Sequence, residues 1–210
     1  MKKGVFITFE GNDGAGKTTI MKLVKEELES QGYEVVSTRE PGGSAIAESI
    51  RNLILDVNNT NMDARCEALL YAASRRQHLV EIVLPALKEN KIVLCDRFLD
   101  SSLAYQGFAR QIGVQEVLDI NKFAIDDILP DRTIFLSVSV ETGKKRMDSR
   151  GEKNRLDLEE SDFHKRVRQG YQNLIETYPE RIKVVSAEAD VNTVFQNTLT
   201  EVLKVISLYE

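Results

Sequence analysis

A glycine-rich run near the N-terminus has the residue types and the spacing of a phosphate-binding loop. It matches the pattern G-x-x-x-x-G-K-[ST] without a gap. Glycines in such a loop let backbone N–H groups point inward and hold phosphate oxygens, and the helix that follows directs its positive end at the same anion. The residues expected to bind the phosphates of a nucleoside triphosphate are Gly11, Asn12, Asp13, Gly14, Ala15, Gly16, Lys17, Thr18 and Thr19.

Two side chains of this loop would act on the phosphates and on a metal ion. We expect Lys17 to reach the β- and γ-phosphates and the hydroxyl of Thr18 to serve Mg²⁺. Asp96 directly follows the apolar run Ile92–Cys95, so it is a candidate second Mg²⁺ ligand, either directly or through water. Many strands end in aspartate, and Asp96 is therefore informative only together with the loop. The combination indicates a nucleoside triphosphatase or a kinase.

Three further polar clusters could hold a second ligand. The loop Arg39–Gly43 contains Pro41 and two glycines and follows a predicted strand. Tyr71 and Arg75 are four residues apart, so on a helix they share a face that could stack on a base and hydrogen-bond to its edge. Ser102, Tyr105 and Gln106 share a face in the same way. Each cluster alone is equally well explained by packing or by solvated charge, but all three are expected near one edge of the same sheet.

A strongly basic segment lies in the second half of the chain. Residues 144–168 carry nine basic and six acidic side chains, whereas the whole chain has a formal net charge of −5. Residues 147–157 lack an apolar period and include Arg150 and Arg155. We expect a lid whose arginines neutralise charge on a transferring phosphoryl group. The alternative is a solvated surface loop.

The elements that must position these residues alternate along the chain. Short apolar runs predict strands over Gly4–Phe9, Glu34–Thr38, Ile92–Cys95, Thr133–Val138 and Ile182–Ser186. Helical spacing of apolar residues predicts helices over Thr19–Ser30, Ala45–Leu55, Asp63–Glu89, Ser101–Arg110, Val114–Leu129 and Asp190–Leu208. We expect Pro85 to kink or break the third helix.

This alternation predicts an α/β fold. Strands separated by helices form a parallel sheet, here of five strands, with helices on both faces. With 210 residues, no repeat and no linker, the chain is expected to form a single doubly wound domain. Ligands of such sheets bind beyond the carboxyl ends of the strands, where the polar motifs above occur.

Composition and charge exclude several other classes. A pI of about 5.3 argues against a nucleic-acid-binding protein, and no apolar run approaches the length of a membrane helix. The N-terminal apolar run is too short for a signal peptide, so a cytoplasmic protein is expected. Cys66 and Cys95 are too isolated to indicate a disulfide or a zinc site, and Cys95 is expected to be an inert buried thiol. His78 and His164 are interpreted as structural.

Four motifs, taken in order, resemble those of the thymidylate kinase family. They are Phe9-Glu10-Gly11 through Thr19, Thr38-Arg39-Glu40-Pro41-Gly42-Gly43, Asp96-Arg97-Phe98 with Ser101 through Gln106, and Asn154-Arg155-Leu156-Asp157. The resemblance covers essentially the whole chain, and the second and third motifs are far more specific than the phosphate loop. It implies a P-loop kinase fold and the phosphorylation of dTMP to dTDP by ATP and Mg²⁺ in dTTP biosynthesis. The γ-phosphoryl group would pass in line to the dTMP phosphate, without a side-chain nucleophile.

The resemblance also implies roles for individual residues. Those implied for dTMP are Arg39, Glu40, Arg51, Tyr71, Arg75, Arg97, Ser102, Tyr105 and Gln106. Within this set, Arg97 would align the dTMP phosphate and Tyr71 would stack on thymine. Arg75, Ser102 and Gln106 would hydrogen-bond to the base, and Tyr105 would pack against the deoxyribose. Glu40 would lie between the acceptor and the metal.

The catalytic set implied by the family is Lys17, Arg97, Asp13, Arg150 and Arg155. The variable positions of the phosphate loop hold no arginine, so the lid must supply it, as in the common bacterial arrangement. This chain has Asp13 where the family often has glutamate, Tyr71 where it often has phenylalanine, and Phe98 where it commonly has tyrosine. These departures put the fine discrimination of the acceptor in doubt.

The family is typically a homodimer paired through helices. The helix predicted over Asp63–Glu89 is a candidate interface because its apolar residues cover much of its surface, namely Leu69, Leu70, Leu79, Val83 and Leu87. The alternative is burial of these residues against the sheet of a monomer. Two other function classes stay open, a kinase for a different nucleoside or nucleotide and a non-catalytic nucleotide-binding module.

Overall fold

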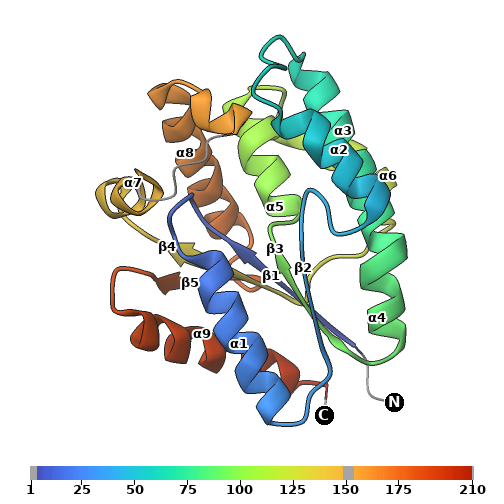
Figure 1. The fold of residues 1–210 in the computed structure, drawn as a ribbon, viewed down its shortest axis with the longest axis vertical. Helices are drawn as coiled ribbons and strands as arrows, with labels where there is room; N and C mark the ends of the chain where they lie inside the picture. Colours follow the sequence, from blue (N-terminus) through green and yellow to red (C-terminus); the bar gives the residue numbers. More distant parts are fainter. Residues whose placement is uncertain (1–3, 149–153, 210) are drawn as a thin grey trace.

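Five short strands form one sheet in which all neighbouring strands run parallel. The computed structural model describes residues 4–148 and 154–209. The strands are β1 (Val5–Glu10), β2 (Val35–Arg39), β3 (Ile92–Asp96), β4 (Arg132–Ser137) and β5 (Ile182–Ser186), in the order β2-β3-β1-β4-β5. The predicted five-stranded parallel sheet of an α/β fold is confirmed (Figure 1).

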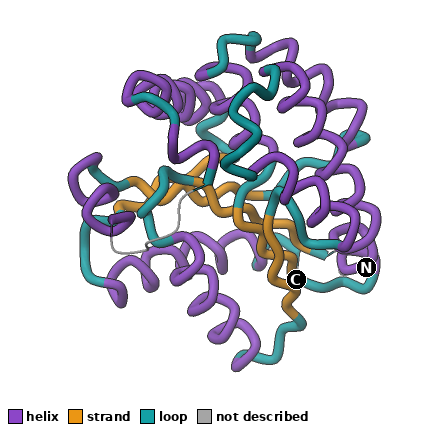
Figure 2. Tube along the Cα trace, turned by 45° about the horizontal axis from the view of Figure 1, so that its top comes forward, coloured by secondary structure: helices purple, strands orange, loops and turns teal. Residues whose placement is uncertain are grey.

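Helices cover both faces of this sheet (Figure 2). On one face lie α1 (Lys17–Ser30) and α9 (Val191–Ile206), whose apolar residues share one core with β1. The other face carries α3 (Ala64–His78), η1 (Leu79–Val83), α4 (Leu84–Lys88), α5 (Leu99–Ser102), η2 (Leu103–Ala109), α6 (Val114–Ile125) and α8 (Ser161–Thr177). The remaining helices are α2 (Ala45–Leu55), α7 (Val140–Asp148) and the short 3₁₀ turn η3 (Arg155–Leu158).

The alternation of side chains along β1 assigns its residues to the two cores. Val5, Ile7 and Phe9 pack with α1 and α9. Phe6 packs into the core on the opposite face, and the side chain of Glu10 contacts α5 and α8 there. Successive side chains of a strand point to opposite faces, so a polar residue at the end of this buried strand is brought under the helices of the second face.

The long helix predicted over Asp63–Glu89 is present with an irregular middle. Asp63 caps α3 by accepting hydrogen bonds from the backbone of Arg65 and Cys66. The irregularity expected at Pro85 takes the form of the π-helical segment η1, which ends immediately before α4 begins. Proline has no N–H and crowds the preceding turn, and a wider turn relieves both problems.

Two other predicted helices differ from the structure. The helix expected over Ser101–Arg110 begins at Leu99 and becomes π-helical from Leu103 to Ala109. The helix expected to reach Leu129 ends at Ile125, because Asp126 and Asp127 adopt left-handed backbone conformations with φ values of 51° and 62°. Aspartate tolerates this conformation better than most residues, and two such residues in succession end a right-handed helix.

Helix α8 approaches η2 closely at a glycine. A Cβ atom on Gly170 would lie 2.9 Å from the Cβ atom of Phe108 and 3.1 Å from the Cα atom of Ala104. The absence of a side chain therefore lets Tyr171, the next residue of α8, lie over the end of β1. Within the described residues, no helix is both long and apolar enough to span a membrane.

Candidate functional site

The carboxyl ends of three neighbouring strands meet at one edge of the sheet. Phe9 of β1 and Arg39 of β2 both pair with Asp96 of β3. The phosphate loop, the Arg39–Gly43 loop and the segment after Asp96 therefore lie side by side, as their motifs predict.

A cavity of about 280 Å³ opens at this edge. It is lined by Asp13, Gly14, Gly16, Lys17, Thr18, Arg39, Glu40, Pro41, Arg51, Leu55, Tyr71, Arg75, Asp96, Arg97, Phe98, Ser101, Tyr105, Gln106, Asn154, Leu156 and Asp157. The structure thus brings together residues from both predicted sites, the phosphate loop and the polar clusters of the second ligand.

The phosphate loop depends on backbone conformations that only glycine adopts easily. Gly14 and Gly16 have φ values of 79° and 86°, and a Cβ atom on Gly14 would lie 2.3 Å from the carbonyl oxygen of Gly143. Helix α1 begins at Lys17, so its N-terminus faces the loop. Of the remaining predicted loop residues, Ala15 is buried and Thr19 is exposed.

The ammonium group of Lys17 is folded back onto the loop. Its Nζ donates to the carbonyl oxygens of Gly11 and Asn12 at 2.9 and 3.3 Å. Burial and the nearby Arg97 lower the pKa of Lys17, although Asp96 and Asp13 oppose this shift. Because Lys17 also lines the cavity, its ammonium group can donate to an entering phosphate in place of the two loop carbonyl oxygens.

Thr18 and Asp96 form the candidate magnesium site. The Thr18 hydroxyl donates to Asp96 Oδ2 at 3.0 Å, and both residues line the cavity beside Lys17. A hydroxyl and a carboxylate are suitable ligands for Mg²⁺, which usually keeps several waters and binds substrate phosphates. Across residues 4–148 and 154–209 no cluster of three acidic, histidine or cysteine ligands occurs.

Arg97 lines the cavity and is held there by several hydrogen bonds. Its backbone is left-handed, with a φ of 69°, and its N–H donates to the carbonyl oxygen of Phe9 at 2.9 Å. One guanidinium nitrogen donates to Asp13 Oδ1 at 2.6 Å, and another donates to the hydroxyls of Ser101 and Tyr171, both at 3.2 Å. Burial alone would raise the pKa of Asp13, but Arg97 and Lys17 outweigh it and hold that pKa at about 2.

Glu10 was not predicted as a site residue, although it is linked to Arg97 through the hydroxyls of Ser101 and Tyr171. Glu10 is fully buried and accepts hydrogen bonds from Phe98 N at 2.8 Å, Ser101 Oγ at 2.6 Å and the Tyr171 hydroxyl at 2.8 Å. Burial and the nearby Asp100 raise the pKa of Glu10. The available signal was an acidic residue ending an otherwise apolar strand.

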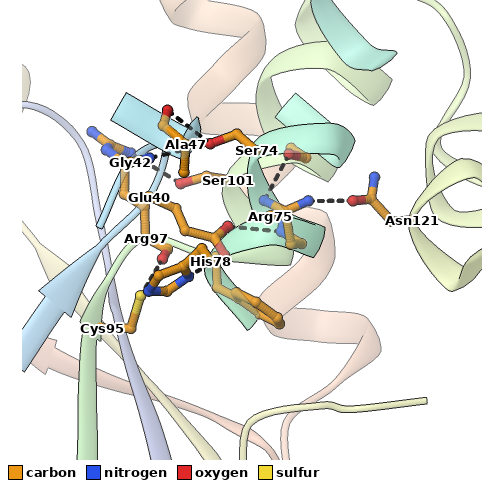
Figure 3. A network of polar contacts seen from close by, with 12 residues as sticks. Glu40, Gly42, Ala47, Ser74, Arg75, His78, Cys95, Arg97, Ser101 and Asn121 are labelled. Atoms are coloured by element: carbon orange, nitrogen blue, oxygen red, sulfur yellow. Dashed lines mark hydrogen bonds and ion pairs between the residues drawn. The ribbon is translucent and has the colours of Figure 1, made fainter. Parts of the chain in front are cut away.

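Arg75 of α3 also lines the cavity, and a network of buried hydrogen bonds holds it in place (Figure 3). Its Nε donates to Glu40 Oε2 at 2.7 Å, one Nη donates to Ser102 Oγ at 3.1 Å, and the other donates to Asn121 Oδ1. His78 bonds the second oxygen of Glu40 at 2.9 Å, which agrees with its interpretation as structural. Asn121 and this use of His78 were not predicted, because both depend on helix packing.

The structure separates the predicted base-binding residues into two groups. Tyr71, Tyr105 and Gln106 line the cavity, whereas Ser102 lies behind Arg75 and is not part of the lining. Burial and the nearby Glu67 raise the pKa of Tyr71, so its hydroxyl stays protonated.

Two predicted arginines border the cavity from α2 and the end of β2. Both oxygens of Glu48 accept from Arg39 Nη2 at 2.8 and 3.0 Å, and Arg51 Nη1 donates to the carbonyl oxygen of Pro41 at 2.8 Å. Both residues line the cavity together with Lys17 of the phosphate loop and Tyr71. Cys95 is buried, as expected, and burial raises the pKa of its thiol.

The predicted lid is only partly within the described residues. Arg150 lies outside them, whereas Asn154, Leu156 and Asp157 line the cavity. Arg155 is buried and turned away from the cavity lining. Its Nη2 donates to Glu67 Oε2 at 2.5 Å and its Nε to the carbonyl oxygen of Ile54 at 2.8 Å. A contact between Arg155 and phosphate stays a prediction that requires this pair to separate.

Comparisons with known proteins agree on one family. A family model described as thymidylate kinase matches residues 9–198. The chain is 57% identical over 198 residues to "Thymidylate kinase" of Clostridium novyi (strain NT), covering 93% of this chain and 97% of that one. It is 58% identical over 211 residues to "Thymidylate kinase" of Bacillus velezensis, covering 98% and 99%. A crystal structure of thymidylate kinase from Ehrlichia chaffeensis superimposes with a TM-score of 0.78 at 36% identity, over 96% of this chain and 99% of that chain.

Proposed function

The chain belongs to the thymidylate kinase family, whose reaction is the phosphorylation of dTMP on the way to dTTP, and from this premise we propose how its cavity performs that reaction. The donor is ATP with Mg²⁺, and the γ-phosphoryl group passes in line to a phosphate oxygen of dTMP. The supporting observation is that Lys17 and Thr18 of the phosphate loop line the same cavity as Tyr71 and Gln106. Arg97 connects the two groups, because it bonds Asp13 of the loop and lies over the ring of Tyr105 at 5.3 Å.

The ATP side of the cavity is built from the phosphate loop. Backbone N–H groups between Gly11 and Thr19 and the N-terminus of α1 hold the phosphates. Lys17 leaves its two loop carbonyls and bonds the β- and γ-phosphates. Thr18 and Asp96 would hold Mg²⁺, which neutralises charge on the phosphate oxygens when bound. No side chain is required as a nucleophile, so positioning and electrostatics are the protein's contribution.

Arg97 aligns the acceptor phosphate. Its guanidinium is held by Asp13 and Ser101, its backbone is left-handed, and the residue lines the cavity. Arg39 and Arg51 add positive charge on the other side of the acceptor phosphate. A guanidinium binds phosphate in a directional, bidentate way, which suits the alignment of one oxygen for attack.

The base lies against the wall formed by α3 and η2. Tyr71 stacks on thymine, Arg75 and Gln106 bond its edge, and Tyr105 packs against the deoxyribose. Glu40 and Ser102 hold the guanidinium of Arg75 in place.

Residues 147–157 act as a lid that supplies Arg150 and Arg155 to the transferring phosphoryl group, within a single domain formed by the chain. Because Arg155 is paired with Glu67, its contribution requires lid closure to open that pair. The arginine of such a lid would stabilise charge that develops in the transition state.

The enzyme is further proposed to be a cytoplasmic homodimer. Leu79 and Val83, two of the predicted interface residues, are fully buried in the core and are not available. Leu69 on α3 and Ile46 and Leu53 on α2 are instead about half exposed and offer apolar surface to a second copy. Sedimentation at micromolar concentration should show a dimer, and a species of the monomer mass alone would contradict it.

The experiment for the proposed reaction is a coupled assay of ADP release. Purified protein is given ATP and Mg²⁺ with dTMP, dUMP, dCMP, dGMP, dAMP or thymidine, and K17A serves as the inactive control. Release confined largely to dTMP supports the reaction and the base-binding assignments. Efficient release with another acceptor would keep the kinase and discard the assignments to Tyr71, Arg75 and Gln106.

A further inference from the structure

Glu67 is a buried carboxylate that the proposed reaction does not use. It lies in the first turns of α3, is fully buried, and does not line the cavity. Both of its oxygens are nevertheless occupied by donors. Oε1 accepts from Gln106 Nε2 at 2.8 Å and from Arg110 Nε at 3.2 Å. Oε2 accepts from Arg110 Nη2 at 3.0 Å and from Arg155 Nη2 at 2.5 Å.

This carboxylate is fixed both in charge and in position. Burial alone would raise the pKa of Glu67, but its bonds to Arg110 and Gln106 outweigh burial and lower that pKa, so the group is ionised at neutral pH. An ionised carboxylate accepts hydrogen bonds and cannot donate them. The guanidinium of Arg110 forks across both oxygens and lies over the ring of Phe163 at 4.6 Å, so the carboxylate cannot rotate away.

The fixed acceptor determines how the amide of Gln106 points. A glutamine amide has a donating NH₂ and an accepting carbonyl oxygen, and only the NH₂ can face a carboxylate. The carbonyl oxygen must therefore point away from Glu67. Gln106 lines the cavity, and its Oε1 is buried without a hydrogen-bond partner among the described residues. A buried acceptor of this kind is costly until a ligand donates to it.

We infer that Glu67 is a positioning residue for base selection, which locks Gln106 with its carbonyl oxygen toward the cavity so that the site requires a pyrimidine carrying an N–H donor. The inference rests on the proposed reaction. Thymine presents a ring N–H at N3, whereas cytosine presents an unprotonated acceptor at the same place. With the Gln106 amide held in this orientation, the N3–H of thymine donates to its carbonyl oxygen. The unprotonated N3 of cytosine would instead place a second acceptor against that oxygen.

The test is the ratio of kcat/KM for dTMP to kcat/KM for dCMP in the variant E67Q. A neutral glutamine at position 67 can donate as well as accept, so Gln106 becomes free to turn over. The ratio is expected to fall by at least about tenfold, mainly through a higher KM for dTMP. Both substrates are measured on the same sample, so a lower folded fraction cancels from the ratio.

Two further variants separate positioning from a general loss of charge. Glu159 bonds the same Arg110 at 2.5 Å, but no contact joins it to Gln106, and E159Q should leave the ratio within about twofold of wild type. In a Q106A background, E67Q should have no further effect on the ratio. An unchanged ratio in E67Q, or an equal fall in the Q106A background, would overturn the inference.

If E67Q fails to fold, a measurement on the unmodified protein tests the same inference. The side-chain NH₂ signals of Gln106, assigned by their absence in Q106A, should exchange slowly with solvent and remain protected when dTMP is bound. Exchange at the rate of an exposed glutamine would contradict the locked amide. Failure of the wild-type protein to phosphorylate dTMP would instead overturn the proposed reaction, and with it the base that Gln106 is inferred to select.

Discussion

The two halves of the cavity are built in different ways. The proposed ATP side comes from nine consecutive residues, 11–19, whose backbone is expected to do most of the binding, with Lys17 and Thr18 as the main side chains. The acceptor side is assembled from side chains on separate helices, held by buried ion pairs such as Glu40–Arg75 and Glu67–Arg110. The geometry of the contiguous loop is determined by its local sequence. The acceptor side forms only when α3, η2 and η3 pack together.

The largest expected effect is on the ATP side. K17A should lower kcat by about 10³-fold, because the phosphates lose a buried cation in a site of low dielectric, while the Kd for dTMP stays within about threefold. Steady-state kinetics and calorimetry measure the two quantities. Lys22→Ala, an exposed lysine on the same helix, is the matched control. A comparable loss of dTMP affinity in K17A would mean that the two halves do not bind independently.

On the acceptor side, loss of an ion-pair partner should affect folding as well as binding. R75A leaves Glu40 buried without its guanidinium partner, and the free energy of unfolding should fall by about 3 kcal/mol. R76A, which removes the neighbouring exposed arginine bonded to the Ala124 carbonyl, should cost less than about 1 kcal/mol. Denaturant unfolding monitored by circular dichroism compares them. Equal losses of unfolding free energy in R75A and R76A would show that the buried Arg75–Glu40 pair contributes no more to stability than the exposed contact of Arg76.

The lid arginines test whether the segment near residue 155 belongs to the ATP side or to the acceptor wall. R150A and R155A should each lower kcat by about 10²-fold with the Kd for dTMP nearly unchanged. R155A should also lower Tm, because Glu67 loses one of its donors. Kinetics, calorimetry and thermal melts separate these outcomes. A lower Tm and weaker dTMP binding with kcat retained would assign Arg155 to the acceptor wall alone.

The smallest effect concerns the pair that joins the two halves. The folded-state pKa of Asp13 is depressed to about 2 from an ordinary 3.8, so its pair with Arg97 stabilises the fold at pH values above that ordinary pKa. The stability advantage of wild type over D13N should therefore be constant from about pH 5 to pH 8 and disappear as pH falls toward 2. Urea unfolding across this range measures it. An advantage that varies between pH 5 and 8 would contradict the depressed pKa.

Sequence reasoning succeeded where function depends on local pattern. The five strands, the phosphate loop and the position of Asp96 follow from apolar runs and from residues that succeed them. Helical spacing also grouped Tyr71 with Arg75, and Ser102 with Gln106, and the structure brings Tyr71, Arg75 and Gln106 to one cavity. Their role in binding a base stays a prediction.

Sequence reasoning did not reveal the residues that hold those side chains from behind. Glu10 and Glu67 are buried acidic residues, and the hydrogen-bond partners of their carboxylates lie between 39 and 161 positions away in the chain. Ser102 shares the predicted helix face with Gln106, yet it bonds Arg75 and does not line the cavity. Such contacts depend on tertiary packing, which periodicity does not encode.

The central claim is that donor and acceptor bind together in one cavity, with Arg97 between them. The most direct measurement is inhibition by adenosine and thymidine joined 5′ to 5′ through a chain of phosphates. The account predicts competition against both ATP and dTMP, with an affinity well above that of either nucleotide, because one molecule fills both halves. Competition against ATP alone, with dTMP still able to bind, would place the acceptor elsewhere and contradict the account.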